Sequence, residues 1–200
     1  MTDERRFISA IPEAGSKTFV DLGAGHGRAA GFLSDLAGDV IAIEINPDMH
    51  AELERTAVQL PNVTAVNGDI LSLPEHLPEG LEQPVFLVLQ NGLGTIEGGD
   101  HNDVLKVVTS EAGLRRGQLV LSVLRQPVLS GWGVDFYEKI SKMTGKVDAS
   151  KTNFETGHMI TVTGYESKWW TDAEIANFRT LGRLSREHTE PEYSLLQLDF

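Results

Sequence analysis

The chain has 200 residues, a length typical of one domain, and its 40% hydrophobic and 23% charged content is that of an ordinary globular protein. It contains no cysteine, which excludes disulfides, cysteine–zinc sites and thiolate nucleophiles. No apolar run approaches the roughly 18 residues that a membrane span needs, and no signal-peptide pattern follows the N-terminus. We therefore expect a cytoplasmic protein without a membrane partner.

Acidic residues exceed basic ones by 29 to 17, which gives a formal net charge of −12. Affinity for nucleic acid comes largely from neutralised phosphates, and a net acidic chain repels them at range. The charge therefore argues against a nucleic-acid partner. It leaves a small-molecule ligand and a homodimer open.

Apolar runs alternate with helical patterns from residue 18 to residue 124. This alternation predicts a mostly parallel sheet with helices on both faces. The expected strands cover about 18–22, 40–44, 63–67, 84–90 and 118–124, and the expected helices about 26–37, 48–59 and 100–114. Pro74 and Pro78 indicate a loop with a short helical turn between the third and fourth strands.

The segment 125–170 departs from this alternation and reads as an insertion after the fifth strand. We expect a helix over 134–143 and a β-hairpin formed around Gly157. Thr171 and Glu174 form a capping box that starts a helix to about residue 180. Two final strands, 182–189 and 193–200, should pair antiparallel. The expected fold is a single domain, 1–200: a doubly wound α/β sheet of seven strands with a C-terminal antiparallel pair.

The turn after the first strand carries three alternating glycines, Gly23, Gly25 and Gly27, preceded by Asp21. Glycine permits positive φ and leaves no Cβ in the way, so a ligand can lie against bare backbone. A dinucleotide fingerprint has the spacing G-x-G-x-x-G, whereas this turn is G-x-G-x-G. Asp21 would repel a diphosphate, so the turn favours a ligand with a cationic or amino group.

The run Asp21-Leu-Gly-Ala-Gly-His-Gly27 resembles the first motif of the class I S-adenosylmethionine-dependent methyltransferases. Two further acids match that family, because Glu44 ends the second strand and Asp69 follows the third. The resemblance covers about residues 15–125. It implies that Glu44 accepts hydrogen bonds from the ribose hydroxyls and that Asp69 meets the adenine amino group. The implied cofactor-binding residues are Asp21, Gly23, Gly25, Gly27, Glu44, Ile45, Asp69, Ile70, Gln90 and Asn91.

Plain structural interpretations stand beside these assignments. Asn46 and Pro47 after Glu44 are typical of a helix start, and Asp69 is a suitable cap for the next turn. The Asn91-Gly92 pair is typical of a turn. We also weigh a cofactor-binding protein without transfer activity, acting as a regulator or scaffold. A nicotinamide-dependent oxidoreductase is disfavoured by the glycine spacing and by Asp21.

The resemblance implies methyl transfer from S-adenosylmethionine to a small-molecule nitrogen or oxygen nucleophile by in-line displacement. The fourth strand ends in Gln90-Asn-Gly-Leu-Gly-Thr95 rather than in the Asp/Asn-Pro-Pro-aromatic signature of nucleobase and amide methylation. A base is needed only if the nucleophile arrives protonated. The run Asp100-His-Asn-Asp103 does not make a metal site, because neighbouring residues at a helix start cannot all face one ion, and Asp100 suits a helix cap.

The insertion supplies the candidates for the acceptor side. His158 and Tyr165 are candidate catalytic bases or positioning groups. Arg125 would bind an acceptor carboxylate or form a surface ion pair. Trp169 and Trp170 would enclose the acceptor or form the insertion's own small core. We expect this segment to select the acceptor and to leave cofactor affinity unchanged.

Overall fold

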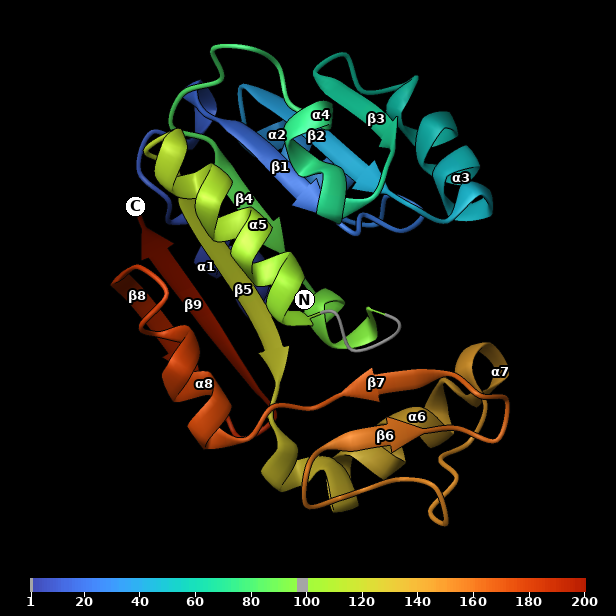
Figure 1. Ribbon diagram of the computed structural model, residues 1–200. Helices are drawn as coiled ribbons and strands as arrows, with labels where there is room; N and C mark the ends of the chain where they lie inside the picture. The colour runs from blue at the N-terminus through green and yellow to red at the C-terminus, as the bar shows by residue number, and fades with distance from the viewer. Residues whose placement is uncertain (1, 97–100) are drawn as a thin grey trace.

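The computed structural model describes residues 2–96 and 101–200, so residue 100 of the expected third helix and the cap assigned to Asp100 lie outside the described residues. A seven-stranded sheet forms the centre, in the order β3-β2-β1-β4-β5-β9-β8 (Figure 1). Its strands are β1 Thr18–Leu22, β2 Asp39–Glu44, β3 Val63–Asn67, β4 Val85–Val88, β5 Gln118–Leu124, β8 Arg183–Thr189 and β9 Tyr193–Asp199. Strands β1 to β5 pair parallel and β9 pairs antiparallel with both neighbours, as predicted.

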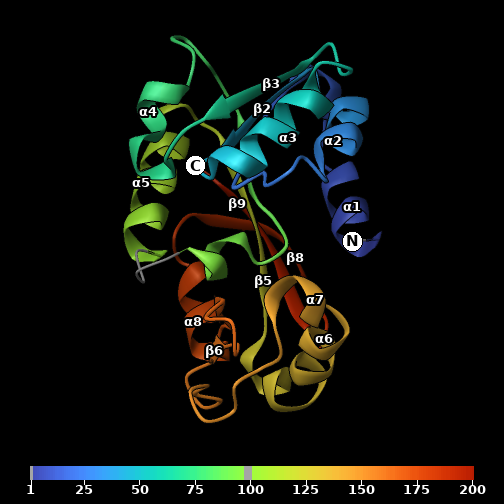
Figure 2. The ribbon, with the colours of Figure 1, turned by 90° about the vertical axis from the view of Figure 1, so that its right-hand side faces the viewer.

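Helices cover both faces of the sheet, as the alternating pattern predicts. They are α1 Thr2–Ser9, α2 Ala30–Leu36, α3 Pro47–Ala57, α4 Leu73–His76, α5 His101–Leu114 and α8 Asp172–Phe178. In Figure 2 the sheet runs between α4, α5 and α8 on one side and α1 and α2 on the other. The larger core contains Val104 of α5 and Phe178 of α8, and the core of the opposite face contains Ile8 and Leu33.

The strand order reverses between β1 and β4, because the chain runs outward from β1 through β2 to β3 and then crosses to the far side of β1. In open α/β sheets, ligands bind outside the carboxyl ends of the strands at such a switch point. The carboxyl ends of β1 and β4 therefore locate the candidate site from topology alone.

The insertion forms a small layer of its own beyond these carboxyl ends (Figure 1). It contains α6 Val134–Lys139, α7 Ser141–Thr144 and the hairpin of β6 His158–Ile160 with β7 Glu166–Lys168. The expected helix is thus two short helices. The hairpin turn lies at 161–165 rather than at Gly157, which precedes β6 with φ 73°. Gly157 packs against the residue that follows β7 so closely that an added Cβ would lie 2.0 Å from the Trp169 carbonyl oxygen.

Helix α1 is an element that the sequence patterns did not predict. Tyr193 Oη donates a hydrogen bond of 2.9 Å to Asp3 Oδ2, and the Arg186 guanidinium donates to the Phe7 carbonyl oxygen while lying 4.3 Å from the Phe7 ring centroid. Ile8 in the helix and Ile11 just after it are both buried. Contacts to β8 and β9, at the other end of the chain, therefore fix α1 in place.

Candidate functional site at the carboxyl ends of the parallel strands

The glycine-rich turn after β1 has two kinds of glycine, although all three have positive φ (73°, 57° and 84°). A Cβ added to Gly23 or Gly25 would have no atom within 4 Å, so the backbone there faces open space. A Cβ on Gly27 would lie 2.9 Å from the Leu53 side chain on α3. Gly27 is therefore required for packing, whereas Gly23 and Gly25 leave a cradle that a ligand can enter.

Glu44 ends β2 beside this turn and is buried. Its Oε2 accepts a 2.8 Å hydrogen bond from the Gly25 amide, and its Oε1 accepts one of the same length from the Asn46 amide. Asn46 in turn caps α3 by accepting from Asp48 and Met49. Asn46 thus starts the helix, while the Glu44 carboxylate lies beside the glycine-rich turn. Each oxygen of that carboxylate keeps a further lone pair for a hydroxyl group.

Ile45 is the apolar side chain that the structure leaves open beside Glu44. It is 62% exposed, which is unusual for a large aliphatic residue next to a buried strand end. Its predicted place in the cofactor site requires an accessible apolar surface, and the structure provides one.

Asp21 is 3% exposed at the end of β1, in register with Ala42 and Leu87 of the neighbouring strands. Its carboxyl group accepts no hydrogen bond from any residue that the structure describes. Burial first, then the charges of Glu4 and Glu44, raise its pKa to about 7. A buried acid without a partner is costly, and a cationic ligand would relieve that cost.

Asp69 takes the capping role that the sequence left open. Its Oδ1 accepts a 2.9 Å hydrogen bond from the Leu71 amide at the start of the short helical turn 70–72. This bond holds the carboxylate at the carboxyl end of β3 and leaves Oδ2 without a bond from the described residues. Ile70 packs against the larger core.

Asn91 has a structural role that sequence reasoning missed. Its Oδ1 accepts from the Leu124 amide and from Trp170 Nε1, both at 3.1 Å. Its Nδ2 donates to the Lys168 carbonyl oxygen at 2.9 Å and to Ser167 Oγ at 3.2 Å. The side chain therefore joins the end of β4 to β5 and β7. Direct cofactor contact through this amide, as predicted, would require one of these bonds to break.

Gln90 and Asn91 both have left-handed backbone conformations, with φ 55° and 61°. Two such residues in succession turn the chain sharply after β4. The turn directs the backbone N–H of Gln90 to Glu4 Oε1 on α1, with an N–O distance of 2.9 Å. Glu4 is therefore a member of the site that the sequence analysis missed. The available signal was helical spacing, because Glu4 precedes the apolar Ile8 and Ile11 by four and seven residues.

The two tryptophans predicted to bind the acceptor are core residues, which corrects that prediction. Trp169 is fully buried with Leu129, Tyr137 and Met159 in the insertion's own core. Trp170 is buried in the larger core, with its ring 4.9 Å from that of Phe178. Neither side chain can enclose a ligand without unpacking. The alternative of a small core within the insertion holds for Trp169, whereas Trp170 belongs to the core of the sheet.

Arg125 forms the surface ion pair that was its alternative interpretation. Its Nη2 lies 2.7 Å from Asp172 Oδ1 at the start of α8, and its Nη1 donates to the Glu190 carbonyl oxygen at 3.0 Å. Both partners lie near the end of β5, so the guanidinium stabilises the exit from the sheet. Its predicted contact with an acceptor carboxylate would have to compete with Asp172.

His158 and Tyr165 lie on one hairpin but differ as candidate bases. His158 is exposed on β6, and its Nε2 lies 3.0 Å from Glu166 Oε2 on β7, a pairing in which the carboxylate can orient the ring. Burial raises the pKa of Tyr165, and the neighbouring Tyr137 raises it further. A phenol with a raised pKa stays protonated, so Tyr165 is a poor base and can act only as a neutral hydroxyl group.

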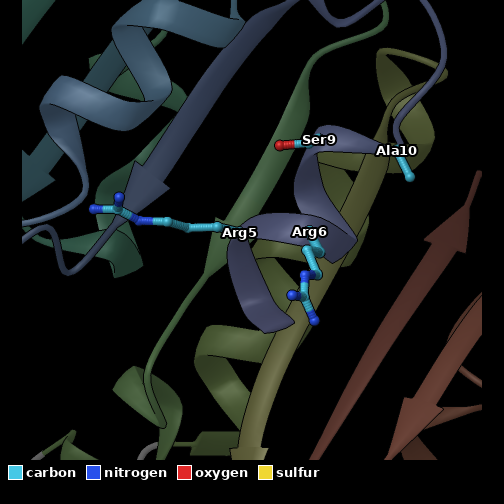
Figure 3. Close-up of a pocket in the computed structure, with 4 residues that line it drawn as sticks. All are labelled: Arg5, Arg6, Ser9 and Ala10. Atoms are coloured by element: carbon cyan, nitrogen blue, oxygen red, sulfur yellow. The ribbon is translucent and has the colours of Figure 1, made fainter. Parts of the chain in front are cut away.

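Other surface features do not add to this site. No group of acidic and histidine side chains among residues 2–96 and 101–200 has the arrangement of a metal site, and no helix in those ranges is long and apolar enough to cross a membrane. An open hollow on α1 is lined by Arg5, Arg6, Ser9 and Ala10 (Figure 3). The Arg5 guanidinium there lies 5.1 Å from the centroid of the Phe32 ring on α2.

The residues present fit S-adenosylmethionine. The open backbone at Gly23 and Gly25 provides the cradle that the ligand would fill. The unpartnered Asp21 matches a group that is positively charged, and Glu44 keeps acceptor capacity beside it. The exposed Ile45 offers an apolar surface for a ring.

The chain is similar to known proteins in sequence and in fold. Residues 19–108 match the family described as methyltransferase domain. A stretch of 72 residues is 38% identical to protein-L-isoaspartate O-methyltransferase 2 of Anaeromyxobacter sp. (strain Fw109-5), and it covers 34% of this chain and 30% of that protein. The match thus spans less than a third of that relative's length.

Two solved structures share the fold over nearly the whole chain. The CcbJ methyltransferase from Streptomyces caelestis is 19% identical, with a TM-score of 0.65 over 98% of this chain and 94% of that one. The 1,6-didemethyltoxoflavin-N1-methyltransferase of Burkholderia thailandensis, solved with S-adenosylhomocysteine, is also 19% identical, with a TM-score of 0.62 over 99% and 79%. The glycine-rich turn and the switch-point topology agree with the family match: residues 19–108 match a methyltransferase domain, within a chain that has the fold of solved methyltransferases.

Proposed function

We propose that the protein transfers a methyl group from S-adenosylmethionine to a nitrogen or oxygen atom of a small molecule. The observation that carries this proposal is the donor cradle, in which open backbone at Gly23 and Gly25 lies beside the unpartnered carboxyl group of Asp21. The sulfonium of the donor supplies an already activated methyl group. The protein then has to align the two reactants and exclude water.

The donor end would be held by groups from three successive strands. Asp21 faces the positive charge at the methionine end, Glu44 accepts from the ribose hydroxyls, and Ile45 and Ile70 border the adenine. Asp69 keeps one carboxylate oxygen for the adenine amino group while the other caps the following turn. Glu44 and Asp69 are already held by hydrogen bonds and Asp21 is held by burial, so these acids need little ordering when the ligand binds.

The acceptor would lie between the donor cradle and the insertion. Asn91 attaches β7 to the end of β4, next to the glycine-rich turn, so the hairpin is held over the same edge of the sheet. A small molecule suits this arrangement, because the net charge of −12 disfavours nucleic acid. One of the solved structures of similar fold is by name a 1,6-didemethyltoxoflavin-N1-methyltransferase, whose small-molecule acceptor supports the same class here.

General-base catalysis would rest on His158 with Glu166, or would not be used. Tyr165 stays protonated, so it can position an acceptor through its hydroxyl group but cannot take a proton at neutral pH. An acceptor that presents a free lone pair, such as a neutral amine, would need no base.

A binding experiment followed by a turnover screen tests the proposal. Isothermal titration should show binding of S-adenosylmethionine and S-adenosylhomocysteine and no binding of NAD. Incubation with a methyl-labelled donor and panels of amines, phenols and carboxylates should then transfer label to one class. Donor binding without transfer to any panel would favour the regulatory or scaffold role, and NAD binding in place of the donor would overturn the assignment.

A further inference from the structure

Glu4 brings a second buried carboxylate to the donor end of the site, from an element outside the strand–loop–helix units that form it. The residue is 8% exposed, although glutamate on a short surface helix is ordinarily solvated. Its Oε1 accepts the 2.9 Å hydrogen bond from the backbone N–H of Gln90, which follows β4. The first helix of the chain thus reaches the switch point between β1 and β4.

The position of Glu4 is fixed by contacts that have no part in ligand binding. Asp3 accepts a hydrogen bond from Tyr193 on β9, and Arg186 on β8 both stacks over Phe7 and donates to its carbonyl oxygen. Ile8, one turn beyond Glu4, is fully buried. Because these contacts hold the helix on both sides, the carboxylate is pre-organised in its buried place.

Glu4 and Asp21 act on each other inside the protein. The charge of Glu4 follows burial as the next largest cause of the raised pKa of Asp21, and Glu44 on β2 is the other charged group acting on it among the described residues. Asp21 has no hydrogen-bond donor in the described structure. Buried acids with like charges and no cation among them are unfavourable, and a ligand that carries positive charge and N–H donors would reverse that cost.

We propose that Glu4 and Asp21 together bind the ammonium group at the methionine end of the donor, with Glu4 completing the pocket from the N-terminal helix. This inference rests on the proposed donor-binding function. The backbone N–H of Gln90 occupies one oxygen of Glu4, and the second oxygen is the one available to the ligand. Glu4 acts by binding and orientation, and no bond is made or broken at it.

The test compares Glu4→Gln with Glu52→Gln, the same loss of one carboxylate at an exposed position on α3. The new glutamine side chain at position 4 keeps an oxygen that can accept from the backbone N–H of Gln90. The turn after β4 is therefore preserved while the charge is removed. Two probes are titrated calorimetrically: S-adenosylhomocysteine, which carries the ammonium group, and 5′-methylthioadenosine, which lacks the amino-acid portion. We expect Glu4→Gln to raise the dissociation constant of S-adenosylhomocysteine about tenfold and that of 5′-methylthioadenosine less than twofold. Glu52→Gln should change both by less than twofold.

Two results would overturn this inference. The first is a change of less than twofold for S-adenosylhomocysteine in Glu4→Gln, and the second is an equal loss for both probes, which would mean a structural role. Stability without ligand gives an independent readout, because Glu4→Gln should raise the unfolding temperature at pH 8 by relieving the repulsion on Asp21. If the unmodified protein binds neither S-adenosylmethionine nor S-adenosylhomocysteine, the proposed function itself fails. If it binds both and Glu4→Gln is neutral, only the role of Glu4 fails.

Discussion

Replacement of Asp21 by asparagine should stabilise the ligand-free protein at high pH while abolishing donor binding. Asparagine has nearly the shape of the protonated acid but cannot ionise. In the folded protein the pKa of Asp21 is raised from 3.8 to about 7, by burial and by the charges of Glu4 and Glu44. A raised pKa means that the folded state holds its proton after the unfolded chain has lost it, so stability falls as pH rises from about 4 to about 7.

The magnitude follows from the size of this shift. About three pKa units at 1.36 kcal/mol each give roughly 4 kcal/mol of destabilisation in full, of which about 3 kcal/mol develops between pH 5 and pH 8. Asp21→Asn removes that part of the pH dependence. The variant's advantage in unfolding free energy should therefore grow by about 3 kcal/mol over this range, which corresponds to roughly 6–12 °C in unfolding temperature for a chain of this size.

Urea unfolding followed by circular dichroism at pH 5, 6, 7 and 8 measures this difference directly. Asp35→Asn on α2 is the control, because Asp35 is an exposed acid. Its pH profile should run parallel to that of the unmodified protein. A parallel profile for Asp21→Asn as well would refute the reasoning, because Asp21 would then be ionised in the folded state at little cost. The same variant should lose the stabilisation of about 2.7 kcal/mol that donor at 100 times its dissociation constant gives the unmodified protein.

Four further outcomes are expected. Glu44→Ala should weaken donor binding roughly thirty- to a thousandfold in calorimetry, because it removes about 2–4 kcal/mol of charge-assisted hydrogen bonding, and an unchanged dissociation constant in a folded variant would exclude the ribose role. Gly25→Ala should fold, at a cost of about 1–2 kcal/mol for its positive φ, and lose donor binding, whereas Gly27→Ala should lose mainly stability, because its Cβ meets Leu53. Trp169→Ala should cost about 3–5 kcal/mol in thermal unfolding and the partly exposed Trp132→Ala much less, so equal costs would contradict the core assignment. His158→Ala should lower turnover or raise the acceptor's Michaelis constant while donor affinity changes less than threefold, and a matching loss of donor affinity would show that the hairpin covers the whole site.

The sheet was predictable because the inner parallel strands β1, β2, β4 and β5 are buried on both faces and therefore appear as short apolar runs. Strands β1, β3 and β5 have the predicted bounds, and β2 begins one residue earlier. Helix α1 was not predictable in this way. Its pattern is short and strongly charged, and what holds it is the contact of Asp3 and Phe7 with β8 and β9 at the far end of the chain. Propensity and periodicity contain no information about such partners.

The sequence allowed us to propose the site residues that lie in the glycine-rich turn and at the strand ends. It did not show whether the aromatic side chains of the insertion line a pocket or fill a core. The glycines and acids at the strand ends occur in a fixed order, so their positions and the family resemblance were enough to propose them as donor-binding residues. Trp169 and Trp170 were ambiguous, because an aromatic cluster in an insertion has the same composition whether it lines a pocket or fills a core. Only the burial of both rings distinguishes the two cases.

Asn91 explains why the donor end and the insertion form one structural unit. The buried Asn91 side chain accepts from the Leu124 backbone N–H and from Trp170 Nε1, and it donates to the Lys168 carbonyl oxygen and to Ser167 Oγ. It cannot move without leaving several of these polar groups unpaired. The next turn fits as closely, because a Cβ on Gly94 would lie 2.3 Å from the Lys168 carbonyl oxygen. The hairpin is thus set against the end of β4 before any ligand arrives. A methyl acceptor held by the hairpin would meet the donor at a distance fixed by the fold, and this fixed alignment is what in-line methyl transfer requires of the protein.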